Sequence, residues 1–299
     1  MTLPAPAAVL TGDQWRLCEA AHRDRADGLT AAHRARAARG EKHPVEDFLF
    51  TYYSYKPAVL RTWHPGVGVE LEDAAERAQK RWYTTGSTPG TARVDAEAYR
   101  AQKGQLVEAV TRVLRATVDR PARFGCFGLH EWAMVYRRRE HRHPAPLRLG
   151  QARTDAVVEA SELRCTHYDA FRFFTPEAAP RNTVTPTRAS QAETEQPGCL
   201  HANMDLYKWA VKLGPLVPGD LLLDAFELAR DIRYLDMQAS PYDMRAWAGA
   251  PVRIETPEGK AEYVRRQRVF ADRADTLRRR LLAALDTAWP TSEDRAKFG

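Results

Sequence analysis

Three histidines of the chain each lie close to a carboxylate and shortly after a cysteine. The three segments hold Cys126 with His130 and Glu131, Cys165 with His167 and Asp169, and Cys199 with His201 and Asp205. Imidazoles and carboxylates exchange protons near neutral pH and also ligate metal ions. Because the segments share this composition although their sequence patterns differ, we predict that they converge on one polar centre.

His201 and Asp205 are four residues apart in "CLHANMDLYKWAVK", so on a helix they share one face. An apolar stripe that includes Met204 and Tyr207 runs beside them. Two interpretations stay open for this pair. The side chains either point into a cleft as a ligand and a carboxylate, or they only stabilise the helix.

His167 and Asp169 fall on alternate positions with Leu163 and Cys165, as residues on one face of a β-strand do. Such a pair suits metal binding or a proton relay, and it suits equally a buried hydrogen bond that orders the core.

His130 and Glu131 are neighbours, and on a helix neighbouring side chains point about 100 degrees apart. Only one of the two can then face a given site directly. We predict that Glu131 takes part in the chemistry and that His130 supports it.

Three uses of the polar centre stay open: a general acid–base cleft, a His/carboxylate metal site, or a structural network. The candidate catalytic residues are Glu131, Asp169, Asp205, His130, His167 and His201. The alternative metal ligands are His167, His201, Asp205 and Glu131. Zinc held by thiolates is less favoured, because the four cysteines include no C-x-x-C pair.

Aromatic residues are frequent in the same segments and could line a pocket for an aromatic substrate or an extruded base. The candidates for substrate binding are Trp132, Tyr168, Phe171, Phe174 and Tyr207. An apolar core stripe would show the same spacing, so packing is the alternative interpretation.

Periodicity and capping residues predict a mainly α-helical protein with a small β-sheet. The expected helices are 13–39, a buried one from Pro44 through Tyr53, one from the Asp95 cap to Pro121, 199–213, 220–237, and one from the Thr256 cap to about Trp289. The sheet is expected around 163–169, with a short strand in "PVRIETP", and loops are expected at 84–94 and 175–198. The chain should form one globular domain, 1–299, with an alternative boundary near residue 120 between a helical N-terminal part and a site-bearing part.

The composition is that of a soluble globular protein: 299 residues, of which 44% are hydrophobic. No stretch approaches the roughly 20 apolar residues of a membrane helix, and the first residues lack the pattern of an export signal, so we expect a cytoplasmic protein with free thiols. The net charge of +6 is compatible with a nucleic-acid partner but does not require one.

Several long motifs carry a resemblance to a known family: "EKHPVEDFLFTYYSYKPAVLRTWHPGVG", "FGCFGLHEWAMVYR", "THYDAFRFFTP", "EQPGCLHANMDLYKWAVKL", "ELARDIRYLDMQASPYD" and "RIETPEGKAEYVRRQR". The chain resembles the actinobacterial family of about 300 residues that is usually labelled 3-methyladenine DNA glycosylase. The resemblance implies cleavage of the N-glycosidic bond of an alkylated purine in double-stranded DNA, without a cofactor. Glu131, Asp169 or Asp205 would then stabilise positive charge on the sugar or orient a water molecule.

A DNA-binding protein also needs cationic side chains that contact phosphates. The candidates are Arg137, Arg138, Arg139, Arg142, Arg265 and Arg266.

A different class of enzyme is the main alternative. The histidines could hold a divalent metal or a haem, with His201 as an axial ligand, in an oxidoreductase that acts on a small aromatic molecule. A third hypothesis is a non-catalytic domain whose polar centre only organises the core.

Overall fold

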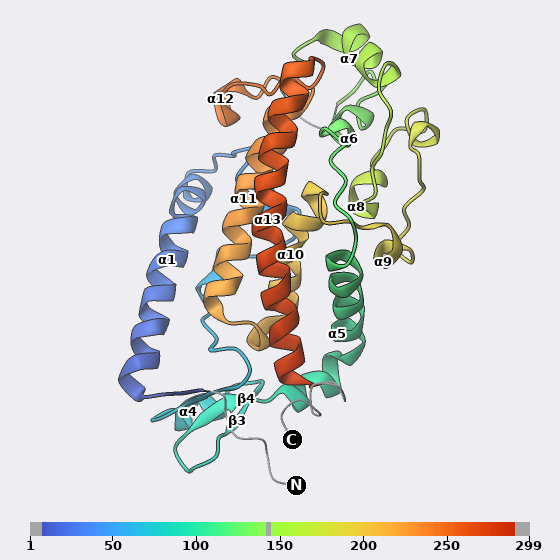
Figure 1. Ribbon diagram of the computed structural model, residues 1–299. Coiled ribbons are helices and arrows are strands. Elements are labelled where there is room, and N and C mark those ends of the chain that lie inside the picture. Colours follow the sequence, from blue (N-terminus) through green and yellow to red (C-terminus); the bar gives the residue numbers. More distant parts are fainter. Residues whose placement is uncertain (1–7, 142–144, 291–299) are drawn as a thin grey trace.

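The computed structural model of the chain describes residues 8–141 and 145–290. Its centre is formed by three helices that pack against one another: α10 (Leu200–Leu213), α11 (Gly219–Ala239) and α13 (Pro257–Ala288). Helix α5 (Ala96–Val118) packs on α13, and α1 (Gly12–Ala38) packs on α11 from the opposite side (Figure 1). The predicted mainly α-helical class with a small sheet is therefore confirmed.

A four-stranded sheet lies at one end of the helices (Figure 1). Its strands are β1 (Ala8–Leu10), β2 (Val69–Leu71), β3 (Tyr83–Thr85) and β4 (Ala92–Val94), in the order β1-β2-β4-β3. The β1–β2 pair is parallel, and the β2–β4 and β3–β4 pairs are antiparallel. The sheet thus belongs to the N-terminal part of the chain and lies away from the predicted site.

Short helical elements connect the long helices. They are α2 (Phe48–Thr51), α3 (Pro57–Arg61), α4 (Ala75–Ala78), α6 (Leu129–Ala133), α7 (Gly150–Glu159), α8 (Tyr168–Phe171), α9 (Gln191–Thr194) and α12 (Arg245–Ala248), with 3₁₀ turns η1 (Ala179–Arg181) and η2 (Gly214–Leu216). In Figure 1, α6 and α8 lie on the side of the central helices that faces away from α1.

Two predicted caps begin long helices as expected. The Asp95 carboxylate accepts a hydrogen bond from the Ala98 amide at 2.8 Å, and the Thr256 hydroxyl accepts one from the Gly259 amide at 3.1 Å. Each cap satisfies a backbone donor that the first turn of the helix leaves without a partner. The predicted helices ending near Pro121 and Trp289 are confirmed in α5 and α13.

The buried helix predicted from Pro44 through Tyr53 is wrong in length, because only Phe48–Thr51 is helical. The Asp47 carboxylate accepts a hydrogen bond from the His43 amide at 2.7 Å, which favours a local turn over a helix start. Ser54 then has a φ of 57°, a left-handed conformation that ends the segment.

The sheet predicted around 163–169 is also wrong, because the segment forms only an isolated parallel bridge, between Leu163 and Asn182. The amide side chain of Asn182 bonds both the amide and the carbonyl of Cys165, each at 2.8 Å, and so takes the place of a partner strand. The segment "PVRIETP" forms no strand either, whereas the predicted 84–94 loop contributes the hairpin of β3 and β4. The Glu70 carboxylate anchors this hairpin by accepting a hydrogen bond from the Ser87 hydroxyl at 2.7 Å.

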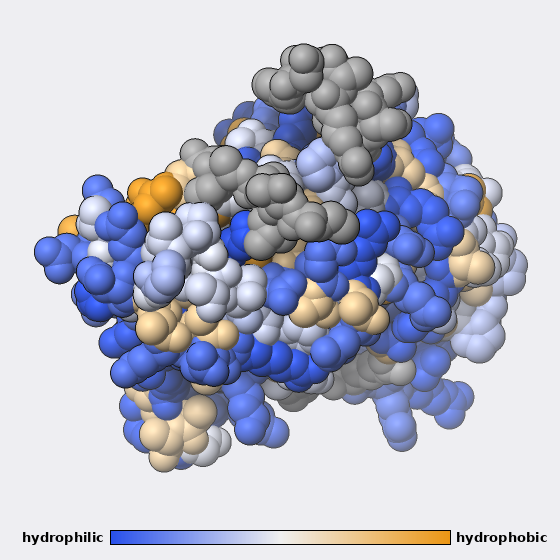
Figure 2. All heavy atoms as spheres, turned by 90° about the horizontal axis from the view of Figure 1, so that it is seen from below, coloured by the Kyte–Doolittle hydropathy of each residue, from blue (hydrophilic) through white to orange (hydrophobic). Residues whose placement is uncertain are grey.

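The largest hydrophobic core includes residues from both sides of the alternative boundary near 120, from Ala26 in α1 to Leu285 in α13. Seen from the end that carries the sheet, the surface is mainly hydrophilic with scattered hydrophobic residues (Figure 2). None of the described helices is long and apolar enough to span a lipid bilayer.

Candidate functional site

The three predicted histidines meet at the start of α10. The rings of His130 and His201 have centroids 4.3 Å apart and lie nearly perpendicular, and the rings of His167 and His201 are stacked at 5.3 Å. His130 comes from α6, His167 directly precedes α8, and His201 is in the first turn of α10. The three histidine rings therefore lie together as predicted, whereas their side-chain partners are divided between two sets instead of forming one polar centre.

A left-handed turn directs His130 toward this centre. Phe127 and Gly128 have φ values of 50° and 72°, and α6 begins at the next residue. A β-carbon at position 128 would lie 3.3 Å from the ring of Tyr263, so glycine also allows the chain to pass close to α13.

His130, Glu131, Arg233 and Asp236 form the first of two charged groups. His130 Nε2 is 2.9 Å from Asp236 Oδ1, while Arg233 Nη1 contacts Asp236 Oδ2 at 2.6 Å and Glu131 Oε1 at 3.1 Å. Burial alone would raise the pKa of Asp236, but His130 and Arg233 hold it well below its usual value. Burial disfavours the charged form of His130, yet Asp236 outweighs this effect and raises its pKa.

The pKa values of Glu131 and His201 are shifted in opposite directions by the same buried surroundings. Burial raises the pKa of the Glu131 carboxyl, and the negative charge of Asp236 adds to this effect. Burial lowers the pKa of His201 well below its ordinary value, and the neighbouring His130 contributes in the same direction. Burial thus shifts both groups toward their uncharged forms.

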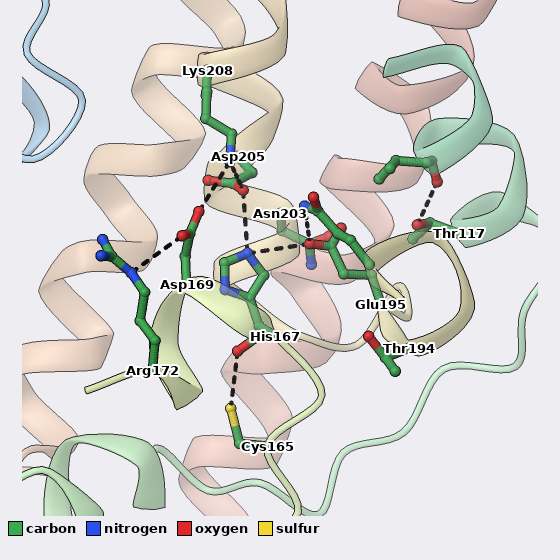
Figure 3. Close-up of polar contacts among 12 residues, drawn as sticks. Thr117, Cys165, His167, Asp169, Arg172, Thr194, Glu195, Asn203, Asp205 and Lys208 are labelled. Atoms are coloured by element: carbon green, nitrogen blue, oxygen red, sulfur yellow. Dashed lines mark hydrogen bonds and ion pairs between the residues drawn. The ribbon is translucent and has the colours of Figure 1, made fainter. Parts of the chain in front are cut away.

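His167, Glu195, Asp205 and Lys208 form the second charged group (Figure 3). His167 Nε2 lies 3.2 Å from Asp205 Oδ2 and 3.3 Å from Glu195 Oε1, and the Lys208 ammonium contacts Asp205. Burial would raise the pKa of Asp205, but Lys208 and His167 hold it well below its usual range. This group therefore contains its own counter-ion.

Two neighbouring side chains donate hydrogen bonds to the carboxylates of the second charged group. The Tyr53 hydroxyl donates to Asp205 Oδ1 at 2.9 Å, and the Gln191 amide donates to Glu195 Oε1 at 2.6 Å. Asp169 lies beside Lys208 Nζ at 3.6 Å and Arg172 at 3.3 Å, so it joins the edge of the network rather than its centre (Figure 3).

A pocket of about 260 Å³ borders the first charged group. Its apolar walls consist of Phe48, Tyr52, Met134, Ala170, Phe173, Met237 and Tyr242. Its polar lining consists of Glu131, Asp169, His201, Arg233, Arg138 and Glu140. Four of these, Glu131, Asp169, His201 and Arg138, are predicted site residues.

The aromatic residues predicted to bind substrate do not line this pocket. Trp132 is fully buried and donates from Nε1 to the Ala239 carbonyl at 2.9 Å, and Tyr207 and Phe174 are buried in the core. Tyr168 and Phe171 are partly buried beside the site but are not among its lining residues. The prediction is corrected for a physical reason: Trp132 follows Glu131 in α6 and therefore points to another side of the helix, into the core.

The arginines predicted to bind DNA have varied surroundings. Arg137 is paired with Glu159 at 2.7 Å, Arg265 with Glu262, and Arg266 bonds the side chain of Gln238 at 2.7 Å. Arg138 and Arg139 are exposed, whereas Arg142 lies outside the described residues. Two of the predicted positive charges, those of Arg137 and Arg265, are therefore already compensated by the protein itself.

Residues that the sequence analysis did not select complete both charged groups. Asp236 follows Arg233 by three positions on the inward side of α11, and charged residues in such an apolar stripe are a signal that could have identified it. Glu195 lies between α9 and α10 in a segment without periodicity, so no comparable signal marked it.

Three cysteines lie on the other side of the histidines. Cys126, Cys165 and Cys199 line a cavity of about 10 Å³ together with His130 and His201, and all three are free thiols. Burial raises the pKa values of Cys165 and Cys199, which disfavours reactive thiolates.

Among the described residues, two sets of three side chains could hold a metal ion: His130 with His201 and Asp236, and His167 with Glu195 and Asp205. In each set the ligand atoms lie within 4.8 Å of one another. The predicted ligands His167, His201, Asp205 and Glu131 are divided between the two charged groups and do not form a single set.

We compared the chain with protein-family models, with curated proteins and with solved structures, and none of the three comparisons gave a match. The resemblance to the 3-methyladenine DNA glycosylase family therefore stays a prediction from the motifs.

Proposed function

We propose that the protein is an enzyme that binds a small planar aromatic molecule in the pocket and uses Glu131 to transfer protons. The observation that carries this proposal is the position of Glu131 in a pocket whose walls are mainly aromatic and methionine side chains. A carboxyl group in apolar surroundings is a common means of proton transfer near neutral pH. Its contact with Arg233 at 3.1 Å fixes the orientation of the carboxylate.

The pocket favours a small ring system. Its volume of about 260 Å³ lies just below the range of roughly 300–1,000 Å³ that is usual for drug-sized ligands. Phe48, Tyr52, Phe173 and Tyr242 offer ring faces and edges against which a flat molecule can pack. This size and lining support a single- or double-ring substrate rather than haem.

Cleavage of an alkylated purine from DNA is the second candidate function. It is favoured by the same pocket, because an extruded base needs aromatic contacts and a nearby carboxylate. The exposed Arg138 and Arg139 next to the site would contact phosphates in that case. The ion pairs of Arg137 and Arg265 weaken this candidate, since both arginines would have to exchange a carboxylate for a phosphate.

Binding and product assays on the same protein separate these functions. Calorimetric titration with adenine, 3-methyladenine and benzoate tests the pocket, and release of free base from methylated duplex DNA tests the glycosylase. We expect binding of at least one free aromatic molecule, weakened at least about tenfold in Met134→Trp, which fills the pocket, and unchanged in Leu17→Trp at an exposed position of α1. Equal affinities in the wild type and Met134→Trp would contradict the proposed site.

A further inference from the structure

Two buried polar atoms in the first charged group form an ion pair but no well-oriented hydrogen bond. His130 Nε2 and Asp236 Oδ1 are 2.9 Å apart, yet neither makes a hydrogen bond with acceptable geometry. Their side chains are 2% and 0% exposed, so water does not solvate them from outside. Buried polar atoms that make no hydrogen bond are costly and rare, and these two are close enough for one bridging atom to contact both.

His201 supplies a third nitrogen at the same place. Its ring lies against His130, and one of its nitrogens is within 4.8 Å of both His130 and Asp236 ligand atoms. Within residues 8–141 and 145–290, no hydrogen bond or ion pair involves the His201 ring, and one of its nitrogens can serve as a ligand atom. Two imidazoles and one carboxylate from α6, α10 and α11 thus face a common point.

The surroundings of these three side chains hold them in place. Arg233 occupies Asp236 Oδ2 at 2.6 Å, which leaves Oδ1 for a single bond, and Cys126 Sγ lies 3.9 Å from His130 Nδ1. Groups that bind the outer atoms of ligating histidines and carboxylates orient the ligands and are typical of metal sites.

The second charged group does not offer such a site. Asp205 is already bonded through Oδ1 to Tyr53 and through Oδ2 to His167 and Lys208, and Glu195 is bonded to Gln191. The ammonium of Lys208 supplies there the positive charge that a metal ion would otherwise bring.

We propose that His130, His201 and Asp236 bind one divalent first-row transition metal ion, with its remaining coordination positions directed toward the pocket. A set of two histidines and one carboxylate with open positions is known for iron(II) and for zinc in enzymes. Because His201 also lines the pocket, a ring nitrogen or oxygen substituent of the bound aromatic molecule, or a water molecule, can reach the ion. This inference rests on the proposed function, since it adds a ligand-binding cation to the same pocket.

Titration of the chelator-treated full-length protein with Co²⁺ and Zn²⁺, followed by calorimetry and by the visible spectrum of Co²⁺, tests the site. We expect one ion per chain in the wild type. His201→Ala and His130→Gln should weaken binding by at least the roughly 10–100-fold that loss of an outer-shell partner causes. His167→Gln, which alters the other set, should leave the metal affinity unchanged.

Three outcomes would overturn the metal site: a wild type that binds neither ion, a His201→Ala protein that binds with the wild-type affinity, or a loss of binding only in His167→Gln. Circular dichroism shows whether each variant is folded, and Glu131→Gln serves as a second folded variant that should keep the metal. Aromatic binding to the metal-free protein is measured in the same series. If the protein binds an aromatic molecule but neither metal ion, the metal site is disproved and the proposed function stands. If it binds a metal ion but no aromatic molecule, the proposed function is disproved and the metal site stands.

Discussion

Glu131 is the residue in which the polar centre and the pocket meet. Its carboxylate contacts Arg233 at 3.1 Å on one side and lines the pocket on the other, and burial raises its pKa. His130, its neighbour in the sequence, faces Asp236 instead. The prediction that only one of these two neighbours faces a given site agrees with this geometry, because Glu131 lines the pocket and His130 does not.

Replacement of Glu131 by glutamine should abolish most of the activity while the protein stays folded. The amide keeps a hydrogen-bond acceptor for Arg233 but cannot transfer a proton, so we expect kcat to fall about 10²–10⁴-fold. Turnover and the melting temperature are measured on the same preparation, with Glu108→Gln, an exposed position of α5, as the matched control. A Glu131→Gln protein with wild-type turnover would show that this carboxylate does not take part in the reaction.

Asp236→Asn should reduce the free energy of unfolding by about 3–5 kcal/mol in the metal-free protein, because it leaves Arg233 with an incomplete set of buried partners. Urea denaturation followed by circular dichroism measures this change. Asp243→Asn, which breaks the exposed pair with Arg245, should leave the transition midpoint unchanged. If Asp236→Asn and Asp243→Asn lower the free energy of unfolding by the same amount, burial does not determine how much Asp236 contributes to stability.

At the scale of elements, Gly198 brings the first and third histidine segments together. A β-carbon at this position would come within 2.4 Å of the Arg123 carbonyl oxygen. The side chain of Gln196 also bonds the amide and the carbonyl of Arg123, at 2.8 and 3.1 Å. The chain that leads to Cys126 and His130 is therefore fixed directly against the start of α10.

Gly198→Ala should separate these two segments and destabilise the protein by about 1–3 kcal/mol, the usual cost of an overpacked core. Gly28→Ala is the control, because nothing lies within 4 Å of a β-carbon at that exposed helical position. It should stabilise α1 by about 0.5–1 kcal/mol. Thermal unfolding of both variants measures the difference, and a neutral Gly198→Ala would contradict the role assigned to this contact.

The elements that could be predicted are those whose stability is mainly local. Apolar periodicity and side-chain caps such as Asp95 and Thr256 located the long helices. The short elements depend on distant partners: Asn182 replaces a strand beside Cys165, and Glu70 anchors the β3–β4 hairpin. Local patterns contain no information about such contacts, so these predictions were wrong.

The same distinction applies to the site. The three histidines and Glu131 could be identified from their types and spacing. The aromatic lining of the pocket could not be identified, because Phe48 and Tyr52 belong to an apolar stripe that is equally typical of a hydrophobic core. Glu195 comes from an irregular segment and joins His167 only through the tertiary fold.

A partly buried histidine outside the site, His64, couples the stability of the whole molecule to pH. His64 lies between the sheet and the helices, with Nδ1 at 2.9 Å from the Tyr83 hydroxyl and its carbonyl bonded to the Gly219 amide. Burial, with a further contribution from Arg77, lowers the pKa of His64 to about 4. The folded protein therefore favours the neutral ring, whereas the unfolded chain binds a proton at about pH 6.5.

Because the unfolded state binds more protons between pH 6.5 and 4, the contribution of His64 to stability should be lost as the pH falls through this window. The expected loss is on the order of 2–3 kcal/mol. Urea denaturation at a series of pH values, compared between the wild type and His64→Gln, isolates this contribution from those of the other titrating groups. If the free energy of unfolding depends on pH in the same way in the wild type and in His64→Gln, His64 makes no such contribution.

We propose that the pocket beside Glu131 and His201 receives a planar aromatic molecule. Of the five methionines, Met134 and Met237 line this pocket, whereas Met204 is buried in the core. The methyl carbon NMR spectrum of protein labelled at methionine, titrated with 3-methyladenine, adenine and benzoate, tests the claim most directly. We predict that at least one of these molecules shifts the Met134 and Met237 signals through its ring current while Met204 stays in place. If Met134 and Met237 do not shift with any of them in the folded protein, or if all methionines shift alike, the pocket is not the binding site.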